Sequence, residues 1–125
     1  MNWIIVIIGS AGLLLSGQAD AQENSALLPI GKKLAEKHCV RCHVVDPSRP
    51  FTGISSTPSF KLLVNELDDW EERFSSFYVR LPHQSIVRVE DQQTGVDSEG
   101  IHPPIHLRTD DIEALVAYAY SLLEQ

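Results

Sequence analysis

Residues 31–43 read GKKLAEKHCVRCH, and this stretch holds both cysteines of the 125-residue chain, Cys39 and Cys42. Only two residues separate the thiols, so a disulfide between them would close too small a loop to brace a fold. The residue after the second cysteine is His43. A chain of this length forms one domain with a modest core. The paired thiols therefore need a chemical role.

The Cys39-x-x-Cys42-His43 spacing is typical of covalent haem c attachment. Each thiol can add to one of the two vinyl groups at a haem edge, and His43 can then ligate the iron. Without the histidine, the two cysteines would suit a redox dithiol or half of a zinc site. No second cysteine pair follows for zinc, and no βαβ pattern surrounds the motif as it would in a thioredoxin-like dithiol. We predict one haem c, bound through Cys39 and Cys42, which would also fill the small core.

The N-terminal residues indicate an exported protein. An apolar run over 3–15 is followed by small and polar residues, and Ala-Asp-Ala at 19–21 is a small-x-small signal-peptidase site. The apolar run is shorter than the roughly 20 residues that span a bilayer. We therefore expect residues 1–21 to be a cleaved signal peptide and residues 22–125 to form a periplasmic domain. A retained membrane tether is the alternative.

The charge of the chain is acidic but uneven. The net charge is −7 at pH 7, and loss of Asp20 with the signal peptide leaves 16 acidic against 10 basic side chains, or −6. This balance argues against non-specific nucleic-acid binding. Half of the basic residues lie near the motif, namely Lys32, Lys33, Lys37, Arg41 and Arg49. They form either a solvated helix face or a docking patch in which Lys32, Lys33, Lys37 and Arg41 steer an acidic redox partner protein. We expect a monomer with no membrane span after signal cleavage.

Several segments resemble the class I c-type cytochromes, specifically the small single-haem bacterial ones. GKKLAEKHCVRCH resembles the family's N-terminal helix running into the haem site, and Gly31 falls where the family keeps a small residue at a close helix crossing. STPSF at 56–60 is similar to the family's Pro-Ser-Phe turn. HPPIHLRTDDIEALVAYAYSLL at 102–123 resembles its Met-Pro-Pro segment and C-terminal helix, with Leu115 and Tyr118 where they would meet the helix of Gly31. The resemblance implies an all-α, cytochrome c-like fold of three to four helices around one haem, and electron transfer without enzymatic activity.

The apolar pattern places helices at compatible positions. Apolar residues recur at helical spacing over 27–34, with Pro29 near the expected helix start, and again over 112–123. A middle helix is predicted over 66–81, with acidic residues in its first turn. Short strands are an alternative for residues 85–90.

The sequence departs from the family at the sixth iron ligand, which is usually the methionine of the Met-Pro-Pro segment. When the two prolines are aligned, that position holds His102, and the only methionine is Met1, which leaves with the signal peptide. We therefore predict His43 and His102 as iron ligands. His83 is the second choice, because the long segment 84–101 could let it reach the iron. Two imidazoles in place of imidazole and thioether would lower the reduction potential.

Two further residues complete the predicted cofactor site. The carbonyl of Pro58 can accept a hydrogen bond from Nδ1–H of His43, although Pro58 also suits an ordinary turn. The indole N–H of Trp70 can bind a haem propionate, with packing in the aromatic core as the alternative. Of the remaining histidines, His38 is expected on the solvent-facing side of its helix, and His106 at the surface or at the haem edge.

The pattern as a whole favours a periplasmic single-haem electron carrier with two histidine ligands. Two other functions stay open at this stage. A five-coordinate c-type haem protein would bind or sense a diatomic gas, and a haem-free C-x-x-C protein would be a thiol oxidoreductase.

Overall fold

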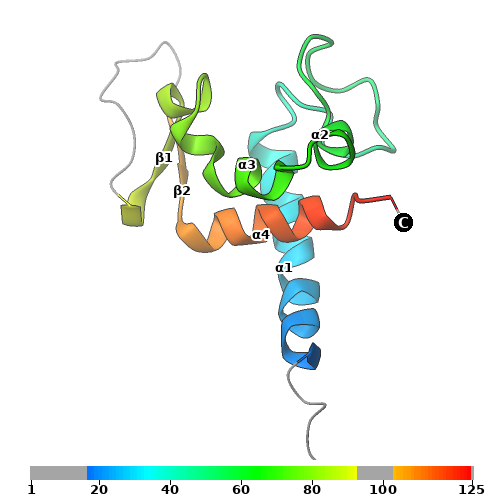
Figure 1. Ribbon diagram of the computed structural model, residues 1–125. Coiled ribbons are helices and arrows are strands. Elements are labelled where there is room, and N and C mark those ends of the chain that lie inside the picture. The colour runs from blue at the N-terminus through cyan, green and yellow to red at the C-terminus, as the bar shows by residue number, and fades with distance from the viewer. Residues whose placement is uncertain (1–16, 93–102, 125) are drawn as a thin grey trace, which may run out of the picture.

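The computed structural model describes residues 17–92 and 103–124. Within these ranges the chain forms four α-helices, three short 3₁₀ turns and one two-stranded ladder (Figure 1). The helices are α1 (Gly17–His38), α2 (Phe60–Glu66), α3 (Trp70–Ser76) and α4 (Thr109–Tyr120). The 3₁₀ turns are Phe77–Val79, His83–Ser85 and Glu90–Gln92, and the strands are β1 (Val87–Val89) and β2 (Ile105–Leu107). The prediction of a mostly helical, all-α architecture is confirmed.

Helices α1 and α4 cross in direct contact, and Gly31 makes the crossing close. Figure 1 shows α4 lying across α1. A Cβ on Gly31 would lie 1.8 Å from the carbonyl oxygen of Ala114 and 2.9 Å from the Cβ of Tyr118. Any side chain at this position would therefore force the helices apart. The expected place of Gly31 at a close helix crossing is confirmed, and the crossing holds the end of α1, where the motif begins, against α4.

The hydrophobic core lies where these two helices meet the loop that follows the motif. Val45, Leu115 and Tyr118 are buried there. The Tyr118 hydroxyl donates a hydrogen bond to the carbonyl of Val45 at 2.7 Å. Burial, and then the nearby carboxylate of Asp46, raise the pKa of Tyr118 to about 12, so this hydroxyl stays protonated and keeps its role as donor. The bond ties α4 to the chain just after His43.

The prediction of one helix over 66–81 is wrong in its bounds. Helix α2 ends where that helix was expected to start, and α3 begins only at Trp70. Between them Leu67 adopts an extended conformation, with φ −112° and ψ 124°, which ends the helical hydrogen bonding. Helix α2 starts because the Ser59 hydroxyl accepts a hydrogen bond from the N–H of Leu62 at 3.1 Å. The turn-like Pro-Ser-Phe sequence hid this helix start.

Helix α1 also begins earlier than predicted, because Pro29 lies inside it and not at its start. The residues before Pro29 include Ala, Gln and Glu, which favour helix and extend it past the proline. Pro29 is exposed, so the hydrogen bond that its ring removes leaves a carbonyl open to water. Among the helices that the structure describes, none is both long and apolar enough to cross a membrane.

Strands β1 and β2 form a short parallel ladder. Val87 pairs with Ile105 and Val89 with Leu107. At the start of the ladder, the N–H of Ile105 donates to the carbonyl of Ile86, the residue before β1, at 2.7 Å. The strand alternative for residues 85–90 is thus realised in β1. The ladder brings the chain that follows His83 beside the chain that leads into α4.

Candidate cofactor site

The motif residues form a tight turn that continues from the end of α1. The N–H of Cys39 donates to the carbonyl of Ala35 at 2.8 Å, which continues the helical pattern. The N–H groups of Cys42 and His43 then both donate to the carbonyl of Cys39, at 3.1 and 2.9 Å. These short-range bonds hold two free thiols and one imidazole on a single turn, and all three side chains line the same cavity.

The loop over residues 53–60 packs against the backbone of this turn. The N–H of Ile54 donates to the carbonyl of Cys42 at 3.0 Å. Gly53 has a φ of 78°, in the left-handed region that favours glycine, and a Cβ there would lie 2.8 Å from the carbonyl carbon of His43. A glycine is therefore needed for the loop to approach so closely.

The same loop orients His43 through Pro58. The Nδ1 atom of His43 lies 2.7 Å from the carbonyl oxygen of Pro58. Because a carbonyl can only accept, Nδ1 carries the proton in this bond, and Nε2 of the neutral ring keeps its lone pair. Metal-binding imidazoles are commonly oriented by such a bond. The hydrogen bond expected between these residues is present.

A cavity of about 620 Å³ lies beside the motif. Its size falls within the roughly 300–1,000 Å³ typical of small-molecule and cofactor sites. Its wall is mainly apolar, and every α-helix contributes to it through Leu34, Phe60, Phe74 and Leu115. The structure therefore surrounds the motif thiols with an apolar space large enough for a sizeable ligand.

His83 also lines this cavity and lies parallel to His43. The two imidazole ring centres are 6.0 Å apart and their planes differ by 10°. The ring of Phe77 packs edge-on against His83, with ring centres 5.2 Å apart and an interplanar angle of 85°. Burial, and secondarily the neighbouring His43, lower the pKa of His83. His83 is therefore neutral at pH 7 and has a nitrogen lone pair to offer a metal.

The spacing of the two imidazoles fits a metal ion bound by both. Metal–imidazole bonds of about 2 Å, with about 1 Å from each nitrogen to its ring centre, sum to roughly 6 Å. Offset ring pairs also occur at about 4.5–7 Å, so the spacing alone does not decide. The added evidence is the cavity that both rings line and the lone pair that the Pro58 bond leaves on His43. These features, with the two thiols, fit a covalently attached haem.

The described side chains contain no group of three or more His, Cys, Asp or Glu residues that could hold a metal ion by themselves. A haem does not require one, because its porphyrin ring supplies the equatorial nitrogens and the protein adds only axial ligands. Two histidines on the cavity wall, His43 and His83, are therefore a sufficient donor set for this cofactor.

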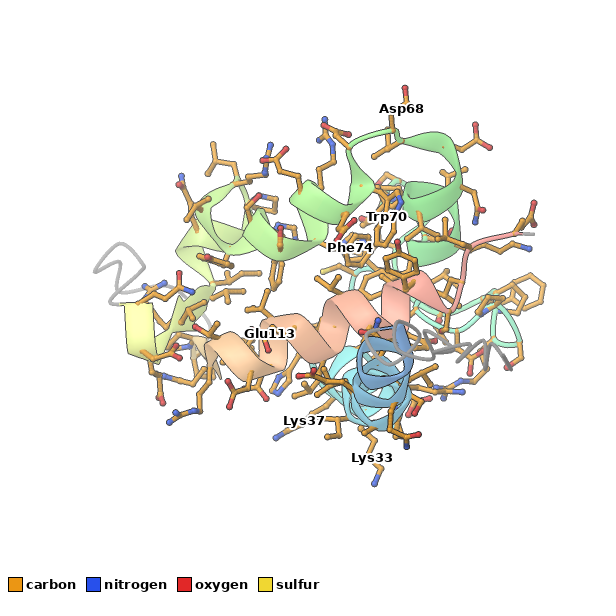
Figure 2. The ribbon with its side chains drawn as sticks, turned by 60° about the horizontal axis from the view of Figure 1, so that its bottom comes forward. Lys33, Lys37, Asp68, Trp70, Phe74 and Glu113 are labelled. Carbon is orange, nitrogen blue, oxygen red and sulfur yellow. The ribbon has the colours of Figure 1, made fainter. Side chains whose placement is uncertain are left out.

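Trp70 lines the cavity and also belongs to the aromatic core. Its ring centre lies 6.0 Å from that of Phe74 and 5.0 Å from that of Tyr120, at 75° in both pairs. Figure 2 shows Trp70 and Phe74 directed from α3 toward α4. Trp70 thus occupies the position expected of a cofactor-binding residue, while most of its contacts are those of packing.

The other histidines differ in their places. His102, the first choice for the sixth ligand, lies outside the described residues. His106 is exposed and its Nδ1 lies 3.1 Å from the carboxylate of Glu90, so the expectation of a surface role is confirmed. The expectation for His38 is wrong, because His38 is half-buried and lines the cavity. Burial accordingly lowers the pKa of His38.

The basic cluster near the motif divides into paired and exposed members. Lys32 lies 3.1 Å from a carboxylate oxygen of Asp46, and Arg49 lies 2.9 Å from one of Glu36. The remaining three, Lys33, Lys37 and Arg41, are exposed. Figure 2 shows Lys33 and Lys37 projecting from α1 away from the rest of the molecule. The surface available for docking is therefore smaller than the sequence cluster.

Sequence reasoning missed two arginines of the cavity wall, Arg73 and Arg80. They follow Trp70 at three and ten residues, positions that keep them near one face of the α3 region. The helical spacing that Trp70 shares with Phe74 and Phe77 could have revealed them.

Comparison of the chain with protein-family models, with curated proteins and with solved structures finds no match. The function must therefore be argued from the residues and their geometry.

Proposed function

We propose that this chain is a single-haem c-type cytochrome that carries electrons. Cys39 and Cys42 hold the haem covalently, and His43 and His83 are its axial ligands. The observation that carries this proposal is the pair of parallel imidazoles, 6.0 Å apart, in an apolar cavity that both motif cysteines also line. A C-x-x-C-H motif, a cofactor-sized cavity and a second histidine in place are independent features that agree.

The bound haem supplies reversible one-electron exchange at iron. His43 and His83 would bind that iron, the carbonyl of Pro58 fixes the His43 ring, and apolar side chains line the space around it. No side chain acts as an acid, base or nucleophile. Two imidazole ligands give a lower potential than imidazole with thioether, and the chain has no methionine after Met1.

His83 replaces His102 as our choice for the sixth ligand. The alignment on the two prolines favoured His102, but His83 has its ring parallel to that of His43 in the described structure. Its lowered pKa keeps it in the metal-binding form at pH 7. The prolines of the aligned segment, Pro103 and Pro104, then serve to lead the chain into β2.

The two other functions have less support. A gas-binding haem needs an open sixth position, and the placement of His83 argues against one. A thiol oxidoreductase needs a cysteine with a lowered pKa, because the thiolate is the nucleophile. Burial, and then the neighbouring Cys42, instead raise the pKa of Cys39 to about 12. Cys39 would therefore remain a thiol at neutral pH.

The remaining parts of the proposal concern location and partners. Haem c attachment accords with export through the segment 1–21, and we place the mature protein in the periplasm. Lys33, Lys37 and Arg41 are exposed near the motif, so they can steer an acidic redox partner protein toward it.

The axial ligands can be tested by low-temperature electron paramagnetic resonance of the ferric protein, produced with a cytochrome maturation system. The wild type should be six-coordinate and low-spin. His83→Ala should yield a high-spin fraction and rapid CO binding in the ferrous form. His106→Ala is the matched control, because that exposed histidine is far from the motif in sequence and pairs with Glu90, and it should stay low-spin.

The same series separates the rival assignments. If His102→Ala opens the iron and His83→Ala does not, the ligand is His102. If the wild type already binds CO readily, the gas-binding function is correct. A protein without covalent haem in a denaturing, haem-stained gel would contradict the cytochrome proposal itself.

A further inference from the structure

The permanently charged side chains of the cavity wall are all positive among the described residues. Among the described residues that line it, Arg73 and Arg80 carry permanent positive charge, and no Asp or Glu contributes to the wall. This is unexpected in a chain with 17 acidic side chains against 10 basic ones. An apolar cavity whose wall includes two arginines and no carboxylate suits an apolar ligand with negative groups at its edge.

The two arginines are held in place from outside the cavity. Nε of Arg73 donates to the carboxylate of Asp69 at 2.7 Å. A terminal nitrogen of Arg80 donates to the carboxylate of Glu72 at 2.5 Å and to the Ser76 hydroxyl at 3.2 Å. These bonds restrict the side chains but use only part of the five N–H donors of each guanidinium. The remaining donors can bind a second carboxylate, which guanidinium groups do with two parallel hydrogen bonds.

We infer that Arg73 and Arg80 bind the two propionate carboxylates of the haem. This inference rests on the proposed function, and it assigns partners for the charged end of a ligand whose apolar ring the cavity accommodates. Trp70, one helical turn before Arg73, presents its indole to the same cavity as an additional donor. Asp69 and Glu72 are then positioning residues that orient the two guanidinium groups.

Arg80 should bind its carboxylate more strongly than Arg73. The two side chains are similarly exposed, at 40% for Arg80 and 45% for Arg73, but Arg80 is held by two partners and Arg73 by one. A charge-assisted bond gains strength as water is excluded. A positive charge near the iron also destabilises its ferric form, so each arginine raises the reduction potential.

The test compares the reduction potentials of holoprotein variants between pH 5 and pH 9. Arg80→Gln should lower the potential and make it depend on pH near neutrality, because loss of the guanidinium raises the propionate pKa. Arg73→Gln should act in the same direction by a smaller amount. Arg80→Lys should restore most of the potential, since it keeps the charge. Arg49→Gln is the control, because Arg49 pairs with Glu36 and does not line the cavity.

The inference is overturned if Arg80→Gln and Arg73→Gln match Arg49→Gln in both the potential and its pH dependence. It is also overturned if Arg80→Lys behaves like Arg80→Gln. A variant that fails to fold is replaced by Ser76→Ala, which removes one partner of Arg80 without changing the charge and should lower the potential by less than Arg80→Gln. These outcomes are measured only on protein with covalent haem, so failure of the inference is distinct from failure of the proposed function.

Discussion

The two sides of the cavity are built in different ways. The motif side comes from consecutive residues, because Cys39, Cys42 and His43 lie on one turn closed by short-range backbone bonds. The facing side places His83 through the packing of Phe77, through the α3 region and through the ladder between β1 and β2. Residues that bind one edge of a ligand together can come from one local turn. A residue on the opposite wall, such as His83, can be placed only by tertiary packing.

The largest expected effect comes from removing the chemistry of the motif side. Cys39→Ala with Cys42→Ala should abolish covalent haem and leave an apoprotein that does not hold the native fold. Without haem the apolar side chains of the cavity would face water, and the lost burial is large beside the stability of a small domain, ~5–15 kcal/mol. Haem-stained gels and circular-dichroism melting measure both effects.

A double variant with the melting curve of the wild type would show that the apolar side chains collapse to fill the cavity. In that case the cofactor is not part of the core. A chemically similar change at exposed Ser55, Ser55→Ala, should alter neither haem content nor melting and serves as the control.

The next largest effect is expected from a change at the crossing of α1 and α4, which would move the motif side of the cavity away from the facing side without altering a residue of either. Gly31→Val should destabilise the protein by about 3 kcal/mol or more, because its Cβ would overlap the backbone of Ala114 across the helix crossing. The motif side moves with α1, so we also expect a weaker bond between the iron and His83. Denaturant unfolding measures the first effect, and CO binding to the ferrous protein measures the second.

Ala26→Val is the control for this change, since Ala26 is exposed on the same helix and should cost less than about 1 kcal/mol. If Gly31→Val melts like the wild type, the two helices do not meet as closely as described. If it is destabilised but binds no CO, the position of His83 does not depend on this crossing.

The smallest effect concerns the surface beside the motif. Lys33→Glu with Lys37→Glu should slow oxidation of the ferrous protein by hexacyanoferrate(III), an anion, by roughly tenfold at low salt. The difference should shrink as salt is added, because exposed charges are screened beyond about 10 Å at 0.1 M. Stopped-flow absorbance measures the rate at each salt concentration.

Lys61→Glu is a suitable comparison, because Lys61 lies in the first turn of α2 and not on α1. Its Nζ lies 2.7 Å from the carboxylate of Glu124. Equal slowing by both changes per unit of charge altered would reflect only the net charge of the protein, because the double change alters it twice as much as Lys61→Glu does. No slowing by the Lys33 and Lys37 changes would make that surface an ordinary solvated helix face.

Much of the site follows from residues that are close in sequence. The C-x-x-C-H spacing is itself a geometric constraint, since two intervening residues set the distance between the thiols and the next residue carries the imidazole. The contact of Gly31 with Tyr118, by contrast, joins residues far apart in sequence and was expected only from the resemblance to the class I c-type cytochromes. The bond from His43 to Pro58 was expected as the contact that orients a metal-binding imidazole.

The tertiary structure alone decided which residues face the motif. Arg73, Arg80 and His83 lie 31, 38 and 41 positions after Cys42 in sequence, and no local spacing relates them to it. The extended conformation of Leu67 separates α2 from α3 where one helix was predicted. Trp70, Arg73 and Arg80, which follow this break, line the cavity. A sequence states what each residue can bind, whereas the folded chain determines which groups meet, because that depends on packing between segments that the chain order does not relate.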